Sequence, residues 1–276
     1  MNNAVFYCDI DRVWDHILCD PGSVNAQTTN PVNHDRDGTP LTVAARSNQR
    51  DRIACLLICA GADPNVRNRS GLTALHVAVS TCNHAVAELL LAAGAWLDVR
   101  TQDINDKQDT PLTLAISYNF ASMTQLLCAA KAHPDATDGC APHPHPSTPP
   151  LPPPSPPHST TVSCCDRAVL TPLQRACGYT KNGFDYRISD TASHVRLLLA
   201  ARADANLASS DTLPPLHAAV VTVNVDAVIA LVAAGADTAK RCWHQEFSAR
   251  LTAYELAEKY ESKRNMREIL CELNPK

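Results

Sequence analysis

Short apolar stretches recur along the chain, and polar strips separate them. The clearest example begins near residue 71. Leu75, Ala78 and Val79 have the spacing of one face of a helix, and a second apolar set with similar spacing occupies residues 84–92. The pattern therefore predicts two short helices joined by a polar turn, with a further polar strip after the second.

Local signals mark the ends of these helices. Thr73 lies where the first helix begins, and its hydroxyl can accept from a free backbone N–H. Proline follows this position in other copies and suits the first helical turn, where no donor is lost; these are Pro40, Pro111 and Pro172. In the second helix we expect Val86, Leu89 and Leu90 to face inward, and Gly94 to end the helix in a left-handed conformation.

The same residue order returns along the chain, at Asp37–Ala45, Gly71–Ala78, Asp109–Ala115, Leu170–Ala176 and Leu213–Ala219, with a degenerate copy at Leu251–Ala257. It resembles the Thr-Pro-Leu-His-x-Ala core and the period of about 33 residues of ankyrin repeats. This resemblance implies an all-α solenoid of stacked helix-turn-helix units, with β-hairpin or loop fingers between them.

The repeat register divides the chain into three parts. We predict an N-terminal cap plus three units over residues 2–138, a disordered proline-rich insertion over 139–168, and two units plus a C-terminal cap over 169–276. Lys131 and Arg202, which flank the insertion, stand where Gly94 and its equivalents stand in other units. A left-handed turn there costs a residue with a side chain on the order of 1 kcal/mol. We therefore expect the middle of the stack to open most easily.

The insertion has two readings. Residues 149–157 contain several Pro-x-x-Pro spacings, a ligand type for SH3, WW and EVH1 domains. The alternative is a tolerated loop, since each doubling of loop length costs only about 0.6 kcal/mol. The segment also gathers residue types that bind zinc, but their spacing is irregular, and we predict no zinc site; these are Cys140, His143, His145, His158, Cys164 and Cys165.

The composition argues against nucleic acid and membranes as partners. The net charge of −4 and the pI near 6.2 give no reason to expect nucleic acid or an anionic membrane. Without a secretory signal at the N-terminus, we expect a cytoplasmic protein, with the nucleus also open. Its cysteines should be reduced, and five of them should be buried in helices as small apolar residues; these are Cys55, Cys59, Cys82, Cys128 and Cys177.

Catalytic motifs are not apparent in the sequence, and we predict a non-enzymatic protein without a cofactor. His76 and His217 occupy the histidine position of the repeat core, where the resemblance implies hydrogen bonds between repeats. Cys82 and His84 form a pair without a third orienting group, which a nucleophile needs.

The resemblance implies an adaptor that binds a partner protein in the concave groove between fingers and first helices, as a monomer. Open alternatives are a scaffold that presents the proline segment and a substrate adaptor of a ubiquitin ligase. The candidate contacts are Arg67, Arg69, Arg100, Gln102, Asp103 and Lys107 on the fingers, and Arg46, Asn48, Ser80, Tyr118 and Asn119 on the first helices.

Three further expectations concern particular side chains. Trp243 lies in an enlarged finger, where it either packs on the stack or is exposed for binding. Arg67, Arg69 and Arg100 would suit an acidic partner or are merely solvated. Asn65 and Asn206 resemble asparagines that an oxygen-dependent hydroxylase modifies in other ankyrin proteins.

Overall fold

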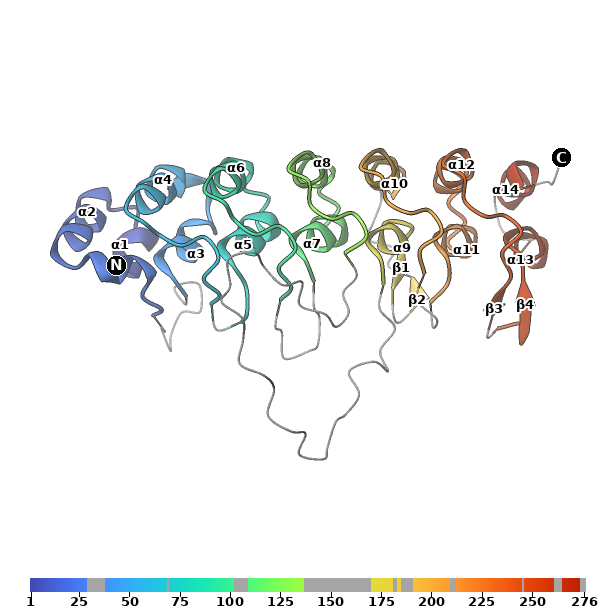
Figure 1. Cartoon of the computed structure of the whole chain (residues 1–276), viewed down its shortest axis with the longest axis horizontal. Helices are drawn as coiled ribbons and strands as arrows, with labels where there is room; N and C mark the ends of the chain where they lie inside the picture. Colours follow the sequence, from blue (N-terminus) through green and yellow to red (C-terminus); the bar gives the residue numbers. More distant parts are fainter. Residues whose placement is uncertain are drawn as a thin grey trace, which may run out of the picture.

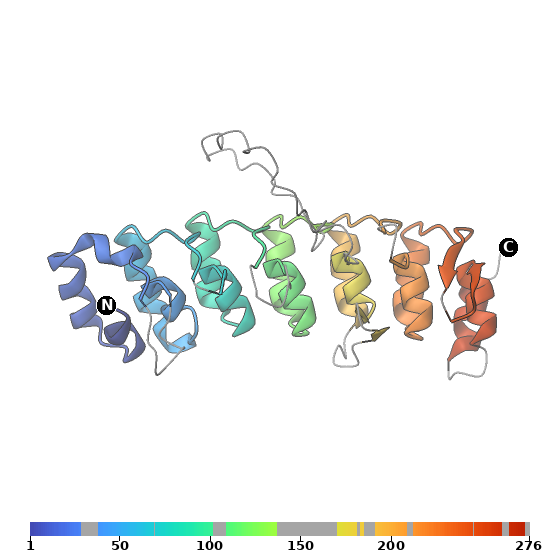
Figure 2. The ribbon, with the colours of Figure 1, turned by 90° about the horizontal axis from the view of Figure 1, so that it is seen from below.

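The computed structural model of the chain describes residues 1–28, 38–68, 70–101, 109–136, 170–180, 183–184, 191–208, 212–244, 246–260 and 265–273. These residues form an elongated stack of antiparallel helix pairs (Figures 1 and 2). In Figure 1 the first helices of the pairs form the lower layer and the second helices the upper layer, with fingers projecting below. The all-α solenoid expected from the sequence is confirmed.

The helices repeat in the same order along the chain. The first helices are α1 (Asn2–Phe6), α3 (Pro40–Ala44), α5 (Ala74–Ser80), α7 (Pro111–Ser117), α9 (Pro172–Ala176), α11 (Pro215–Val221) and α13 (Ala253–Lys259). The second helices are α2 (Ile10–Cys19), α4 (Asp51–Cys59), α6 (His84–Ala92), α8 (Ala121–Ala129), α10 (Thr191–Ala200), α12 (Val225–Ala233) and α14 (Met266–Leu273).

Short elements join some of these helices. Two 3-10 helices, η1 (Pro21–Asn25) and η3 (Asn48–Arg50), lie in the connections after α2 and α3. Strands β1 (Tyr179–Thr180) and β2 (Gly183–Phe184) form one antiparallel pair, and β3 (Cys242–His244) and β4 (Ala249–Leu251) form another. The second pair is the finger that leads into α13.

The first helices begin at the predicted threonines. The hydroxyls of Thr110, Thr171 and Thr252 each accept from a backbone N–H three residues later, at 3.1 to 3.2 Å. Proline follows the cap in α3, α7 and α9, as expected. Helix α6 has the predicted bounds. These caps fix where α7, α9 and α13 start through local contacts alone.

The core is a double row of leucines from α3 onward, and α1 and α2 bury Val5, Val13 and Ile17 in their place. In the first helices the leucine of the repeat core is fully buried in each of the units that carry it, at Leu41, Leu75, Leu112, Leu173 and Leu216. In α13 Tyr254 stands at that position, and Leu256, two residues later, is the buried leucine. The second helices add Leu57, Leu90, Leu127, Leu198 and Leu231. Burying each such side chain contributes about 1.5–3 kcal/mol. Because every unit buries its leucines against its neighbours, stability depends on stacking.

The helix pairs before and after residues 137–169 are neighbours in the same stack. Helix α7 packs against α9, and α8 against α10. Arg175 on α9 forms an ion pair of 2.7 Å with Asp109 and donates to the Ser117 hydroxyl at 2.9 Å. His194 on α10 contacts the Thr124 hydroxyl at 3.1 Å through Nδ1. We call this polar contact region the seam.

Left-handed residues end the second helices where glycine was expected. Lys131 and Arg202 have φ of 68°, close to the values of 81° and 84° at Gly94 and Gly235. The turn geometry is therefore kept without glycine on both sides of the seam. Easier opening of the seam remains a prediction.

Three details differ from the sequence-based expectations. Among the five cysteines expected in the core, only Cys177 is buried; Cys55 and Cys59 are exposed because they lie on the outward face of α4. Cys82 and Cys177 lie just beyond their helices. We expected Leu89 to face inward, but it is half-buried, and Ala87 is buried in its place.

Candidate protein-interaction surface

The candidate contact residues lie along two edges of the first helices. Arg67, Arg100 and Trp243 lie in the fingers, and the remaining described candidates lie at the opposite ends of these helices. Of the latter, only Ser80 belongs to a first helix, as the last residue of α5. The others lie in turns and in η3, because α3 and α7 end at Ala44 and Ser117. Arg69, Gln102, Asp103 and Lys107 fall outside the described residues.

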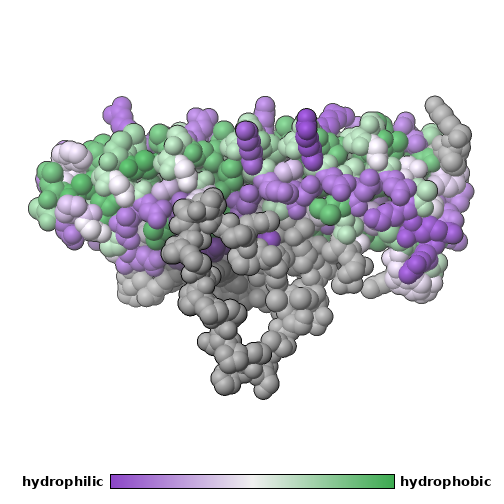
Figure 3. Space-filling model, in the orientation of Figure 1, coloured by the Kyte–Doolittle hydropathy of each residue, from purple (hydrophilic) through white to green (hydrophobic). Residues whose placement is uncertain are grey.

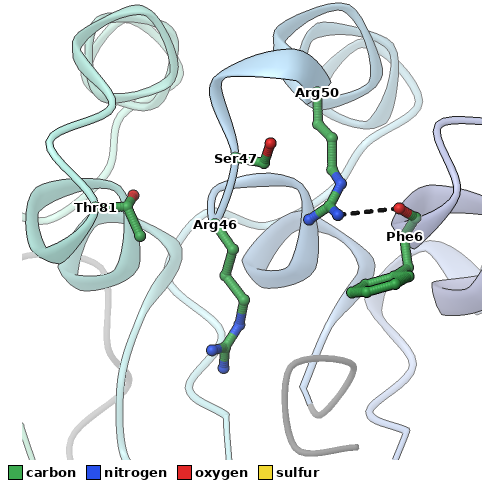
Figure 4. Close-up of a pocket in the computed structure, with 5 residues that line it drawn as sticks. All are labelled: Phe6, Arg46, Ser47, Arg50 and Thr81. Atoms are coloured by element: carbon green, nitrogen blue, oxygen red, sulfur yellow. Dashed lines mark hydrogen bonds between the residues drawn. The ribbon is translucent and has the colours of Figure 1, made fainter.

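A pocket of about 240 Å³ lies at the helix ends near the N-terminus (Figure 4). Its lining comprises Phe6, Arg46, Ser47, Arg50 and Thr81. Arg50 donates to the carbonyls of Phe6 and Val43 at 2.9 and 3.0 Å, and its guanidinium lies 4.8 Å from the centre of the Phe6 ring. Arg50 therefore links the ends of α1 and α3. No motif in the sequence points to this role.

Arg67 ties two neighbouring fingers together. Its Nη1 donates to the Arg100 carbonyl at 2.7 Å and to the Gly71 carbonyl at 3.4 Å. Partial burial lowers the pKa of the guanidinium from its usual value. The side chain of Arg67 is thus held in place by the scaffold.

Trp243 is exposed at 57% on the finger formed by β3 and β4. Its cross-strand partner is Arg250, which is also exposed. The next residue, His244, points inward and stacks on His217, with ring centres 5.6 Å apart. Strand alternation therefore places one aromatic and one guanidinium side by side on the outer face of this finger.

At the other edge, two of the candidates have internal partners. The Ser80 hydroxyl donates to the Val77 carbonyl at 2.9 Å, and Asn119 Oδ1 lies 3.2 Å from His194 Nε2. Tyr118 is 52% exposed and stacks on Phe120 at 5.8 Å. Tyr118 is therefore the candidate on this edge with the largest exposed apolar side chain.

Asn65 and Asn206 have matching surroundings. Each side-chain Nδ2 donates at 3.4 Å to a glycine carbonyl of the next unit, Gly94 or Gly235. Each Oδ1 accepts a backbone N–H of that unit, at 2.8 Å and 2.7 Å. Asn25 makes the same pair of bonds, which the sequence analysis missed. These asparagines connect successive units, and their hydroxylation remains a prediction.

The repeat-core histidines bond between units, as the resemblance implied. His76 Nε2 donates to the Val99 carbonyl at 2.9 Å, and His217 Nε2 to the Leu251 carbonyl at 3.1 Å. Burial lowers the pKa of each to about 4, so both are neutral at pH 7. Cys82 Sγ lies 3.9 Å from His84 Nδ1 at the stack surface.

Within the described ranges, no three potential metal ligands come together, and no helix is long and apolar enough to cross a membrane. The six cysteines and histidines considered for zinc fall in the undescribed segment.

Comparison with known proteins identifies the repeats. Residues 41–138 match the family model of ankyrin repeats in three copies. The chain is 40% identical over 95 residues to human neurogenic locus notch homolog protein 4, a match that covers 34% of this chain and 4% of that protein. It is 40% identical over 111 residues to the mouse B-cell lymphoma 3 protein homolog, covering 38% and 24%. The chain thus spans a minor part of these relatives.

Solved structures with this fold align over the whole stack. The ankyrin repeat domain of Bcl-3 superimposes with a TM-score of 0.68 at 22% identity, covering 99% of this chain and 97% of that one. The human ASB11 ankyrin repeat domain gives 0.63 at 19% identity, covering 100% and 98%. The fold is that of a general protein–protein interaction module, which is non-catalytic as a rule. Residues 41–138 are thus ankyrin repeats by sequence, and the stack as a whole has the ankyrin-repeat fold.

Proposed function

We propose that the chain is a non-enzymatic adaptor that binds a partner protein along its fingers and first helices. The exposure of Trp243 beside Arg250 carries this proposal. Tryptophan and arginine are the residue types that most often dominate binding energy at protein interfaces. A short hairpin fixes the backbone that carries both side chains, so that little backbone entropy is lost on binding.

The charge of the fingers suggests what the partner presents. Arg67, Arg100 and Arg250 all lie on fingers, and Arg67 is already oriented by its bonds to backbone carbonyls. Guanidinium groups bind carboxylates through paired hydrogen bonds. An acidic segment of the partner therefore fits this row, with an apolar side chain against Trp243.

Affinity capture from cell lysate tests the proposal. Replacing Trp243 with Ala should weaken capture of the specific partners at least about tenfold, as expected of an interface anchor. Arg250→Glu should act in the same direction. Ile229→Ala is the matched control, since Ile229 is an exposed apolar residue of α12 in the outer layer. Capture that survives both finger variants would exclude this surface.

A variant without residues 139–168 separates the alternatives. Partners lost only on that deletion would make the proline segment, at residues 149–157, the functional element. Recovery of ubiquitin-ligase subunits that depends on the fingers would support the substrate-adaptor form of the proposal. We further propose a monomer in the cytoplasm or nucleus; sedimentation and fluorescence imaging of the tagged chain test both points.

A further inference from the structure

Helix α2 lies in the outer layer, away from the fingers (Figure 1). It carries a line of exposed apolar side chains. Ile10, Trp14 and Leu18 are 42%, 48% and 66% exposed. They are spaced four residues apart and so lie along one side of the helix. Val13 and Ile17, on the adjoining face, are buried against the stack. We call the three exposed side chains the α2 stripe.

The stripe is specific to this unit. A left-handed residue precedes each of four second helices, at Cys8, Cys82, Asn119 and Val223, and gives them a common register. The sixth residue after it is Trp14 in α2, and Glu88, Gln125 and Ile229 in α6, α8 and α12. The residues four positions before and after it are Ile10 and Leu18 in α2. They are His84 and Ala92 in α6, and Ala121 and Ala129 in α8. Only in α2 do three large apolar residues line up at these positions.

Exposed apolar side chains do not make the stack more soluble, so solubility does not account for the α2 stripe. Helix α14, also in the outer layer, instead exposes Arg267, Glu268 and Glu272. In Figure 3 hydrophobic surface runs along the upper part of the stack and includes its N-terminal end. Large apolar residues exposed in a row commonly mark a binding site.

The charges beside the stripe indicate the chemistry of its partner. Asp11 and Asp15 are exposed and project from the helix side next to Trp14 and Leu18. Asp9 is paired with Arg12 at 3.2 Å, so its charge is already balanced. A second copy would bring the same carboxylates against this rim, and an anionic membrane would be repelled by it.

We infer that the α2 stripe binds an amphipathic helix of another protein that has apolar residues flanked by Lys or Arg. Such a helix would lie along α2 with its apolar face on Trp14 and its basic residues beside Asp11 and Asp15. This surface is separate from the fingers, so that the chain could hold two partners at once.

Site-specific photo-cross-linking tests the inference. The full chain is expressed in cells with p-benzoylphenylalanine in place of Trp14, and cross-linked peptides are sequenced. The expected product is an apolar segment of another protein flanked by Lys or Arg. The matched control places the same group at Ile229. Cross-links to a second copy, to a segment without basic residues, or no more product than at position 229 would overturn the inference.

Charge variants test the acidic rim. Asp11→Lys with Asp15→Lys should reduce the cross-link yield at position 14 about tenfold, because like charges then face each other. Glu268→Lys with Glu272→Lys makes the same change of charge on α14 and should leave the yield unchanged. Equal yields from both pairs of variants would refute the role of the rim. The finger variants of Trp243 and Arg250 should not affect this product.

Discussion

The first helices α5 and α11 begin with the related tetrapeptides Thr73–His76 and Pro214–His217. They differ in the backbone N–H of the first residue, which proline lacks. In α5, Thr73 N–H donates to His76 Nδ1 at 3.2 Å, and the Thr73 hydroxyl lies 2.8 Å from the same nitrogen. In α11, Pro214 replaces the threonine and has no N–H, and His217 Nδ1 is buried without a hydrogen-bond partner. Both rings still donate through Nε2 to the next unit.

The difference shows how one residue sets the strength of a contact between repeats. A buried acceptor without a donor costs about 1–3 kcal/mol. The bond from His217 to the Leu251 carbonyl holds the finger of β4, but it does so with a ring that lacks its second anchor. We therefore expect the α11 unit to be locally weaker than the α5 unit.

Lowering the pH should have the largest effect on the stability of these two units. The pKa of each histidine is about 4 in the folded state and about 6.5 when unfolded, so the unfolded chain binds more protons between these values. The stabilisation is complete above pH 6.5 and is lost as pH falls toward 4, on the order of 3 kcal/mol for each histidine. Urea unfolding at a series of pH values measures it. Carboxylates also titrate near the lower end of this window, so His76→Asn and His217→Asn serve as references; an unchanged pH dependence in both would contradict the prediction.

Truncating the histidines should separate the two units directly. His76→Ala removes a bond at each ring nitrogen and should destabilise the chain by about 3 kcal/mol. His217→Ala removes only one bond and should cost about 1 kcal/mol less. Leu75→Ala and Leu216→Ala are controls, since both leucines are fully buried and should cost similar amounts. A loss at His217 equal to that at His76 would remove the distinction.

Restoring the missing donor should strengthen the weaker unit. Pro214→Thr supplies an N–H and a hydroxyl to His217 and should stabilise the chain by about 1 kcal/mol, after the loss of proline rigidity. Thermal unfolding reports the gain, and the NMR shift of His217 Nδ1 reports the new bond. A lower melting temperature without any change in that shift would show that the helix start cannot accommodate threonine.

The smallest expected effect concerns the seam. Lys131→Gly and Arg202→Gly should relieve left-handed strain, with a net gain below about 1 kcal/mol because glycine is also more flexible when unfolded. Hydrogen exchange should show α8 and α10 opening before α5 and α6 in the natural chain, and the two variants should slow that opening. Uniform protection along the stack would contradict this.

Much of the fold could be predicted because its signals are local. Thr110, Pro111 and Gly94 fix where helices begin and end through their own backbone and nearest neighbours. The seam could not be predicted, because the pairing of Arg175 with Asp109 depends on two residues far apart in sequence. The exposure of single side chains could not be predicted either. The apolar pattern of α4 did not show that Cys55 and Cys59 lie on its uncovered side, so the prediction that both are buried was wrong.

The seam has a topological consequence. Because α7 contacts α9 and α8 contacts α10 directly, the peptide between residues 137 and 169 is a covalent tether and not the only link between the two groups of repeats. A protease cut within the tether would therefore leave a nicked molecule whose fragments stay together. The same contacts would let the two fragments, expressed separately, reassemble as a split protein, with an affinity set by the seam together with the apolar packing of α7 on α9 and α8 on α10.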